Sequence, residues 1–206
     1  MIDFVVTWVD DSDENWLKEK RKYDIVGDKT NANNDTRYRD WGLLKYWFRG
    51  VEKNCPWVNK IFFITYGHVP KWLNLNNPKL AIVKHEDYIP SKYLPTFNSN
   101  VIELHLNKIK QLSNQFVLFN DDMFIIDKVK EKDFFKNGKP VESALLDVLI
   151  KKVPEDIFPY SVMNNMGLIN RHFNKRDVQK KYFFKFFNLK YGKSFFRNIE
   201  LAPLKF

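Results

Sequence analysis

The sequence predicts an α/β fold, namely a mostly parallel sheet with helices on both faces, followed by a helical subdomain. Over residues 1–135, short apolar runs of strand length alternate with segments whose apolar residues recur at helical spacing. This alternation favours a parallel sheet covered on both faces, because parallel neighbours need a crossover connection. Beyond residue 135, helical patterns follow one another without strands. We therefore expect an α/β core at 1–135 and a helical subdomain at 136–206.

Four runs have the composition of buried strands. They are rich in β-branched and aromatic residues and are bounded by polar or turn-forming residues. The predicted strands cover residues 2–8, 60–65, 80–84 and 115–119. Helical spacing of apolar residues marks the intervening and later segments. The predicted helices cover roughly 14–22, 40–54, 99–110, 141–152, 160–172 and 175–188. The Asn- and Asp-rich segment 24–37 has little apolar periodicity and indicates a mobile loop.

Length and cysteine content exclude several classes of protein. A chain of 206 residues can fold around its own core without disulfides. The single cysteine, Cys55, excludes a disulfide framework and a four-cysteine zinc site, and it fits a reducing compartment. No apolar run reaches the roughly 18 residues of a membrane span. The first residues lack the basic and apolar regions of a signal peptide, so we expect a cytoplasmic protein.

The charge balance is basic, with 34 Lys and Arg against 25 Asp and Glu, a formal net charge of +9. Such a balance can indicate nucleic-acid binding. The lysines are scattered rather than gathered into a patch, so no nucleic-acid partner is expected. The densest basic stretch, 175–193, is interleaved with Phe and Tyr. It suits a phosphorylated substrate or an anionic membrane surface, and equally a solvated helix face.

Polar residues follow three of the predicted strands at their carboxyl ends, where open α/β sheets bind ligands. The three ends read Thr7-Trp8-Val9-Asp10, Thr65-Tyr66-Gly67 and Asn120-Asp121-Asp122. Two adjacent carboxylates repel each other unless a cation or a shared proton intervenes. Asp121 and Asp122 are therefore candidate ligands for Mg²⁺ or Mn²⁺, which favour carboxylate oxygens and substrate phosphates. The alternative is a turn in which one aspartate caps the next segment. In the same way, Asp10, Asp11 and Asp13 could form a loop and the N-cap of the helix at 14–22.

Arg37, Arg39 and Asp40 precede a predicted helix. An arginine in this position could clamp a phosphate with the help of the helix N-terminus, or could form an ion pair with a nearby acid. No two histidines have metal-ligand spacing, and there is no Walker loop or Gly-rich dinucleotide turn. Anions would therefore be held by arginine, lysine, a metal ion or helix ends.

Several longer motifs follow one another along the first 135 residues. The first motif is Ile2-Asp3-Phe4-Val5-Val6-Thr7-Trp8-Val9-Asp10. Another is Arg37-Tyr38-Arg39-Asp40-Trp41-Gly42-Leu43-Leu44-Lys45-Tyr46, which runs on to Glu52-Lys53-Asn54-Cys55-Pro56-Trp57-Val58. Shorter motifs follow at 61–67, 70–73, 94–99 and 119–124. Together these segments resemble the Stealth family, and the first two resemble its first and second conserved regions.

The Stealth family comprises bacterial capsular and cell-wall polysaccharide phosphotransferases, and is similar to the catalytic subunit of the lysosomal-enzyme N-acetylglucosamine-1-phosphotransferase. The resemblance implies a glycosyltransferase-A-like core that binds a nucleotide sugar. It implies transfer of a sugar 1-phosphate, expected to be an N-acetylhexosamine 1-phosphate, from a UDP-sugar to a hydroxyl of a polysaccharide or lipid-linked glycan, with release of UMP. Mg²⁺ or Mn²⁺ would bridge the diphosphate. Peripheral contact with the inner face of the membrane would suit such an enzyme.

The resemblance also assigns roles to residues. Asp121 and Asp122 become the metal-binding or catalytic acids, and Asp10 is a third catalytic candidate at the donor pocket. The implied donor-binding residues are Thr7, Trp8, Arg39, Asp40, Thr65 and Gly67. The residues implied to face the acceptor or the donor sugar are Asn98, Ser99, Glu103 and Asn120.

The chain departs from the family pattern at several positions. Trp41 stands where the family usually has Asn, Leu43 where it has Glu, Asp11 where it has Gly, and His68 where it has Gln. The family's third and fourth regions, with a histidine thought to complete the active site, would begin near residue 206. We therefore expect a fragment of a longer protein, which could bind the donor and the metal without turning over. Two alternatives stay open, a metal-dependent glycosyltransferase that releases UDP and a basic polymer-binding module without catalysis.

Overall fold

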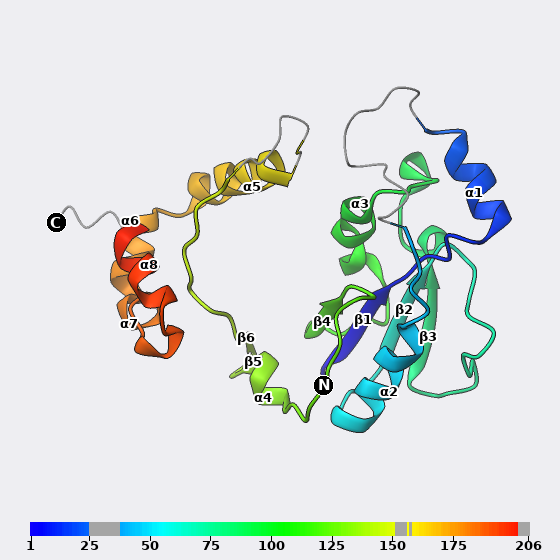
Figure 1. Ribbon diagram of the computed structural model, residues 1–206, viewed down its shortest axis with the longest axis horizontal. Helices are drawn as coiled ribbons and strands as arrows, with labels where there is room; N and C mark the ends of the chain where they lie inside the picture. The colour runs from blue at the N-terminus through cyan, green and yellow to red at the C-terminus, as the bar shows by residue number, and fades with distance from the viewer. Residues whose placement is uncertain (25–37, 151–155, 157, 202–206) are drawn as a thin grey trace. The chain divides into compact units, whose positions relative to one another are not determined.

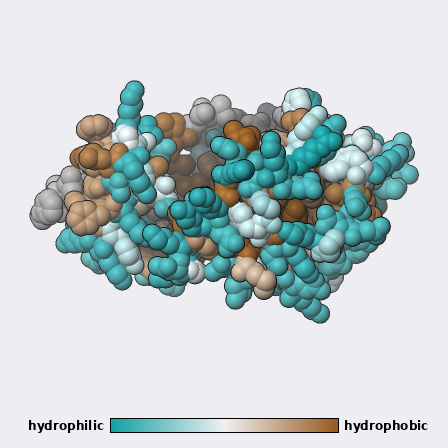
Figure 2. Space-filling view, turned by 90° about the horizontal axis from the view of Figure 1, so that it is seen from below, coloured by the Kyte–Doolittle hydropathy of each residue, from teal (hydrophilic) through white to brown (hydrophobic). Residues whose placement is uncertain are grey.

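The computed structural model describes residues 1–24, 38–150, 156 and 158–201 (Figure 1). The chain divides into two compact units. Among the described residues, the first unit contains 1–24 and 38–141, and the second contains 142–150, 156 and 158–201. Arg37 and nearly all of the predicted loop at 24–37 lie outside the described residues. Figure 2 shows a face on which hydrophilic side chains predominate, as expected for a chain with 29% charged residues.

A four-stranded sheet lies at the centre of the first unit. Its strands are β1 (Asp3–Thr7), β2 (Ile61–Thr65), β3 (Leu80–Lys84) and β4 (Phe116–Phe119). Their order is β3-β2-β1-β4, and every neighbouring pair is parallel. This confirms the predicted strands and the parallel sheet. The chain builds outward from β1 through β2 to β3, then crosses back to place β4 on the other side of β1 (Figure 1).

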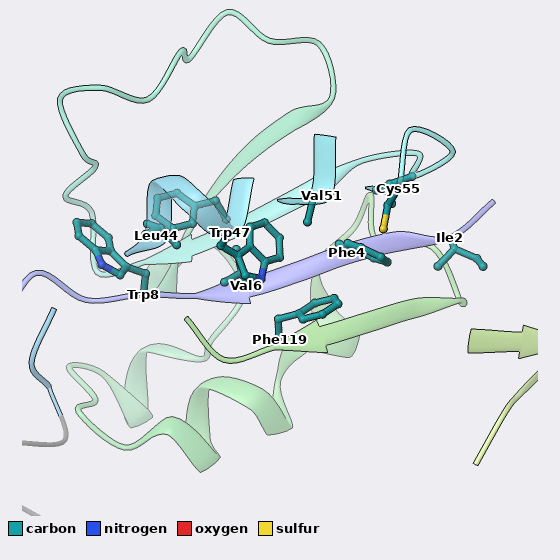
Figure 3. Packing of buried hydrophobic residues seen from close by; sticks show 11 residues of the cluster. Ile2, Phe4, Val6, Trp8, Leu44, Trp47, Val51, Cys55 and Phe119 are labelled. Atoms are coloured by element: carbon teal, nitrogen blue, oxygen red, sulfur yellow. The ribbon is translucent and has the colours of Figure 1, made fainter. Parts of the chain in front are cut away.

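Helices cover both faces of the sheet, as predicted. Along β1, alternate side chains point to opposite faces. Phe4 and Val6 belong to one apolar cluster, and Val5 belongs to the other. The first cluster is closed by α2 (Leu44–Asn54), whose Trp47 is completely buried (Figure 3). The second cluster contains Val101 and Ile102 of α3 (Ser99–Leu104), together with short 3₁₀ turns around residues 85–93 and 106–108.

The predicted bounds agree with α1, whereas the predicted start of α2 and the predicted end of α3 are wrong. Helix α1 (Glu14–Arg21) begins after Asp13, whose carboxylate accepts the N–H of Trp16. Helix α2 begins at Leu44 rather than near residue 40, because Asp40 Oδ1 accepts the N–H of Gly42 in a tight turn. Gly42 has φ +66° in that turn, a conformation that a helix cannot contain.

Helix α3 is also shorter than predicted, ending at Leu104 instead of near residue 110. The ring Nδ1 of His105 contacts the carbonyl of Val101 at 2.8 Å, the carbonyl that the backbone N–H of His105 would use in a continuing helix. The chain then forms a 3₁₀ turn at Leu106–Lys108. After β4 come a short helix, α4 (Glu131–Phe134), and a hairpin of β5 (Phe135–Lys136) and β6 (Lys139–Pro140), none of which the sequence predicted.

The second unit consists of helices and an extended segment. The helices are α5 (Phe158–His172), α6 (Lys175–Lys181), α7 (Phe183–Phe186) and α8 (Ser194–Leu201). The helix at 160–172 is confirmed as α5, the helix at 175–188 is divided at Tyr182, and α8 was missed. The predicted helix at 141–152 is wrong over its described residues, 141–150, which are not helical. Buried Asn198 holds that segment extended by accepting the N–H of Leu146 and donating to the carbonyl of Ala144.

In the part of the chain that the structure describes, no helix combines the length and the hydropathy needed to cross a membrane.

Candidate active site at the carboxyl edge of the sheet

The strand order reverses between β1 and β4, so the carboxyl ends of these two strands form the switch point of the sheet. Open α/β sheets bind their ligands in the crevice outside this point. Val6 of β1 pairs in register with Phe119 of β4. The chain therefore leaves the two strands side by side. The segment after β1 runs to Asp10, and the segment after β4 begins with Asn120, Asp121 and Asp122. On the other side of β1, Thr7 pairs with Ile64 of β2.

Asp10 organises the loop that follows β1. Its Oδ1 accepts both the backbone N–H of Ser12, at 2.9 Å, and the Ser12 hydroxyl, at 2.5 Å. Its own N–H donates to Nε2 of His68, at 2.9 Å. Asp13 serves as the N-cap of α1, as the alternative interpretation of this acidic loop predicted. The Asp10 side chain therefore shapes the edge of the site from within the loop.

His68 joins the ends of β1 and β2, a role that the sequence did not reveal. Burial lowers its pKa, although the nearby carboxylates of Asp13 and Asp10 partly oppose that shift. The neutral ring accepts from Asp10 through Nε2, while Nδ1 lies 3.8 Å from Asp13 Oδ2. Protonation of Nε2 would remove the acceptor, so the arrangement of the β1 loop depends on a neutral His68.

Thr65 and Gly67 form the turn after β2. Thr65 is completely buried, and its hydroxyl accepts the N–H of Gly67 at 3.0 Å. Gly67 has φ +137°, which an L side chain rarely adopts. Thr65 therefore stabilises the turn, and Gly67 is the exposed residue of the two.

Trp8 closes the apolar cluster just past the end of β1 (Figure 3). Its ring stacks on Phe63 with centroids 5.7 Å apart and meets the edge of the His68 ring. The side chain is buried, and its indole Nε1 has no hydrogen-bond partner among the described residues. A buried N–H without a partner is energetically costly, so this donor is unusual among the polar atoms near the edge.

Residues 38–42 bring a further acid to the same edge. The N–H of Asp40 donates to Oδ1 of Asp11 at 3.2 Å, which fastens this turn to the β1 loop. The Asp40 carboxylate lies near enough to Asp121 to raise its pKa. Arg39 is exposed, with its guanidinium carbon 5.3 Å from the centroid of the Trp41 ring. Arg39 is thus available to a ligand, and Asp40 joins the acidic cluster.

Asp121 and Asp122 carry the electrostatic character of the site. Burial, the negative charge of Asp122 and that of Asp40 together raise the pKa of Asp121 to about 6, against the opposing effect of a hydrogen bond to its own backbone. Asp122 is exposed. Half-burying one carboxylate beside two others is unfavourable unless a cation or a proton compensates, and such arrangements are concentrated at functional sites.

These carboxylates suit Mg²⁺ or Mn²⁺ in the type of oxygen atom that they offer. Among the residues that the structure describes, no group of three or more His, Cys, Asp or Glu side chains could enclose a metal ion. A cation on the Asp121–Asp122 pair would therefore take its other ligands from water and from phosphate oxygens of the substrate. Mg²⁺ is commonly bound in this way, by one or two carboxylates and a bound phosphate.

Helix α2 fixes the position of the acidic pair from outside the sheet. The side-chain amide of Asn54 donates to the carbonyl of Ile125 at 3.0 Å, and in the turn after the helix Trp57 Nε1 donates to the carbonyl of Val129 at 2.8 Å. Gly50 allows the close approach, because a Cβ at that position would stand 2.7 Å from the Ile125 oxygen. The segment after β4 is thus attached to α2 directly beyond Asp121 and Asp122.

The residues assigned to the acceptor or the sugar are less closely grouped. Asn98 is the N-cap of α3, where its side chain accepts the N–H of Asn100. Ser99 follows it and is exposed, as is Asn120 at the end of β4. Glu103 lies further along α3, half-buried; burial raises the pKa of Tyr88, and the charge of Glu103 adds to that shift. Asn120 therefore lies at the switch point, whereas Glu103 lies toward the sheet face that α3 covers.

Comparison with known families decides the relationship. Residues 2–25 match conserved region 1 of Stealth proteins, and residues 37–142 match conserved region 2. The chain belongs to the Stealth family. The first range contains β1 and the Asp10 loop, and the second contains α2, the other three strands and the Asp121–Asp122 pair. Every element of the site in this Stealth chain thus lies within the two conserved regions.

Curated relatives carry names from polysaccharide synthesis. The chain is 53% identical over 206 residues to the capsular polysaccharide phosphotransferase WcwK of Streptococcus pneumoniae, covering 98% of this chain and 60% of that protein. It is 46% identical over 199 residues to the capsular polysaccharide phosphotransferase CpsJ of Streptococcus thermophilus, covering 96% of this chain and 82% of the relative. It is 43% identical over 195 residues to the receptor polysaccharide phosphotransferase WefC of Streptococcus gordonii, covering 93% of this chain and 57% of the relative. The Stealth chain thus spans less than two thirds of WcwK and WefC.

Proposed function

We propose that this chain contains the donor site of a polysaccharide phosphotransferase. The enzyme would transfer a sugar 1-phosphate, such as N-acetylhexosamine 1-phosphate, from a UDP-sugar to a hydroxyl of a capsular or cell-wall polysaccharide. The observation that supports this most directly is the position of the Asp121–Asp122 pair at the switch point of the sheet, together with the raised pKa of Asp121. The names of the relatives, which are capsular and receptor polysaccharide phosphotransferases, support the same reaction class.

The reaction forms a bond between the acceptor oxygen and the phosphorus that carries the sugar. The bond from that phosphorus to the bridging oxygen breaks, UMP leaves with the electron pair, and the proton of the hydroxyl passes to a base. A divalent cation would neutralise the diphosphate and stabilise the charge that develops on the leaving phosphate.

The residues of the edge have separate tasks in this proposal. Asp121 and Asp122 hold the cation, and the α2 attachment keeps them in place. Arg39 can offer its planar guanidinium to a phosphate or a ribose hydroxyl. Trp8 supports the edge with its buried ring, and Asp10 shapes the loop beside it. A cytoplasmic location with peripheral membrane contact remains a prediction.

Analysis of the nucleotide product tests the proposed function. The chain is incubated with UDP-N-acetylglucosamine, Mg²⁺ and a capsular oligosaccharide, and the released nucleotide is identified by chromatography. Acceptor-dependent UMP is expected, and Asp122→Asn should abolish it. Asp127→Asn is the matched control, since Asp127 is an exposed acid of the same segment that contacts the next backbone N–H. Release of UDP instead would identify a glycosyltransferase and contradict the reaction. If no nucleotide is released and neither Asp122→Asn nor Asp127→Asn changes the affinity for the glycan, a polymer-binding module is favoured.

A further inference from the structure

Residues 39–49 expose two aromatic rings that lie beside cations. Trp41 is 69% exposed, and Arg39 approaches the centroid of its ring to 5.3 Å. Tyr46 is 50% exposed, and its ring centroid lies 5.2 Å from Lys45 Nζ and 5.7 Å from Arg49 Cζ. We call the surface formed by Trp41, Lys45, Tyr46 and Arg49 the α2 platform.

Folding of the first unit does not require these side chains. Helix α2 packs on the sheet through Leu44, Trp47 and Val51, which lie on its other side. The ion pairs among the described residues do not involve Lys45 or Arg49. The two cations contact a ring instead of a carboxylate, so their charge is available to an anion. Large exposed rings with unpaired cations are typical of surfaces that bind a partner.

The α2 platform begins at the candidate active site and extends away from it. Trp41 directly follows Asp40, whose backbone is bonded to Asp11 and whose charge acts on Asp121. Tyr46 and Arg49 lie on the first turns of α2, and a helix rises about 1.5 Å per residue. A donor bound at the strand ends would occupy the acidic edge itself. A longer ligand could continue from that edge onto the platform.

We propose that the α2 platform binds the acceptor glycan and favours an acceptor that already carries phosphodiesters. This inference rests on the proposed function, because each transfer of a sugar 1-phosphate would add one phosphodiester, and hence one negative charge, to the growing chain. Sugar rings stack on Trp41 and Tyr46 through their apolar faces. Phosphodiesters contact Lys45 and Arg49, which form no ion pair among the described residues.

Glycan binding tests the inference without requiring turnover. Two probes of equal length are titrated into the whole chain by calorimetry: an N-acetylglucosamine oligomer joined by phosphodiesters, and the neutral β-1,4-linked oligomer. The phosphodiester oligomer is expected to bind at least tenfold more tightly at low salt, and added NaCl should weaken its binding alone. Trp41→Ala should weaken binding of the phosphodiester oligomer about tenfold, and Arg49→Gln about threefold.

The chain offers a matched control. Tyr93 is an exposed ring with Lys92 Nζ 4.7 Å from its centroid, and it contacts His105 beyond α3. Tyr93→Ala should leave glycan binding unchanged. Equal affinity for the two oligomers, or equal effects of Trp41→Ala and Tyr93→Ala, would overturn the inference.

Binding of Mg²⁺ and UDP-N-acetylglucosamine to the same variants separates the two proposals. Trp41→Ala is expected to retain donor binding while it weakens binding of the phosphodiester oligomer. The wild-type chain could bind the phosphodiester oligomer as expected and yet bind no donor. That result would contradict the proposed function and support glycan binding by the α2 platform.

Discussion

The raised pKa of Asp121 predicts a specific pH dependence for cation binding. An aspartate with its ordinary pKa of 3.8 is ionised throughout the range from pH 5 to pH 7, whereas Asp121, with a pKa of about 6, is not. At pH 7 roughly one tenth of Asp121 carries a proton, and at pH 5 roughly nine tenths does. Because a cation binds only the ionised carboxylate, its apparent affinity should fall about tenfold between these two pH values.

Titration of Mn²⁺ at pH 7, 6 and 5 measures this effect. Asp122→Asn removes one of the charges that raise the pKa of Asp121. The remaining Mn²⁺ binding should be weaker, and its pH dependence should move to a lower pH range. Asp127→Asn should behave like the wild type. A Mn²⁺ affinity that is constant from pH 5 to pH 7, or an equal effect of the two substitutions, would refute the reasoning.

The same pKa predicts an effect on stability. Because folding raises the pKa of Asp121, the protonated form is favoured in the folded state. The stability from this group is fully present below pH 3.8 and is lost as the pH rises through about 6. Asp121→Asn should therefore stabilise the metal-free protein at pH 7 relative to the wild type, and it should remove the further stabilisation that Mn²⁺ provides. Thermal unfolding of both proteins is measured with and without Mn²⁺. The variant should have the higher unfolding temperature without Mn²⁺, and only the wild type should gain stability when Mn²⁺ is added.

Three further substitutions test how the edge is built. Gly50→Ala places a Cβ 2.7 Å from the carbonyl oxygen of Ile125 and should displace the segment that positions the acidic pair; Mn²⁺ titration should show at least a fivefold loss, and an unchanged affinity would contradict the role of this contact. His68→Leu removes the acceptor of the Asp10 N–H and should lower the free energy of unfolding by about 1–3 kcal/mol, measured by urea denaturation at pH 7; no change would mean that water replaces the ring. Arg39→Lys should weaken binding of UDP-N-acetylglucosamine in calorimetry, since a point charge cannot reproduce a planar fork, and an unchanged dissociation constant would remove Arg39 from the site.

The central sheet could be predicted because its strands carry their own signal. Runs such as Ile61–Thr65 are apolar on both sides, as strands covered on both faces must be. The prediction that the segments after β1 and β4 leave the sheet at one edge followed from the same argument, since parallel strands end at one edge. That part of the site needed no knowledge of side-chain contacts.

Features that depend on distant partners were not predictable. The extended segment at 142–150 has helical spacing, but Asn198 and Tyr191 bind its backbone from far along the chain. The attachment of residue 125 to α2 depends on Gly50 and Asn54, which look like ordinary helix residues. His68 gave only a turn signal, because its role requires the ends of β1 and β2 to be adjacent.

The need for a divalent cation in donor binding tests the central claim most directly. UDP-N-acetylglucosamine is titrated into the chain by calorimetry in the presence of Mg²⁺, then after EDTA, and then with Asp122→Asn in Mg²⁺. The account predicts binding in the first experiment and at least a tenfold loss in the other two. Donor binding of equal strength in all three would show that the paired aspartates at the switch point do not form the donor site.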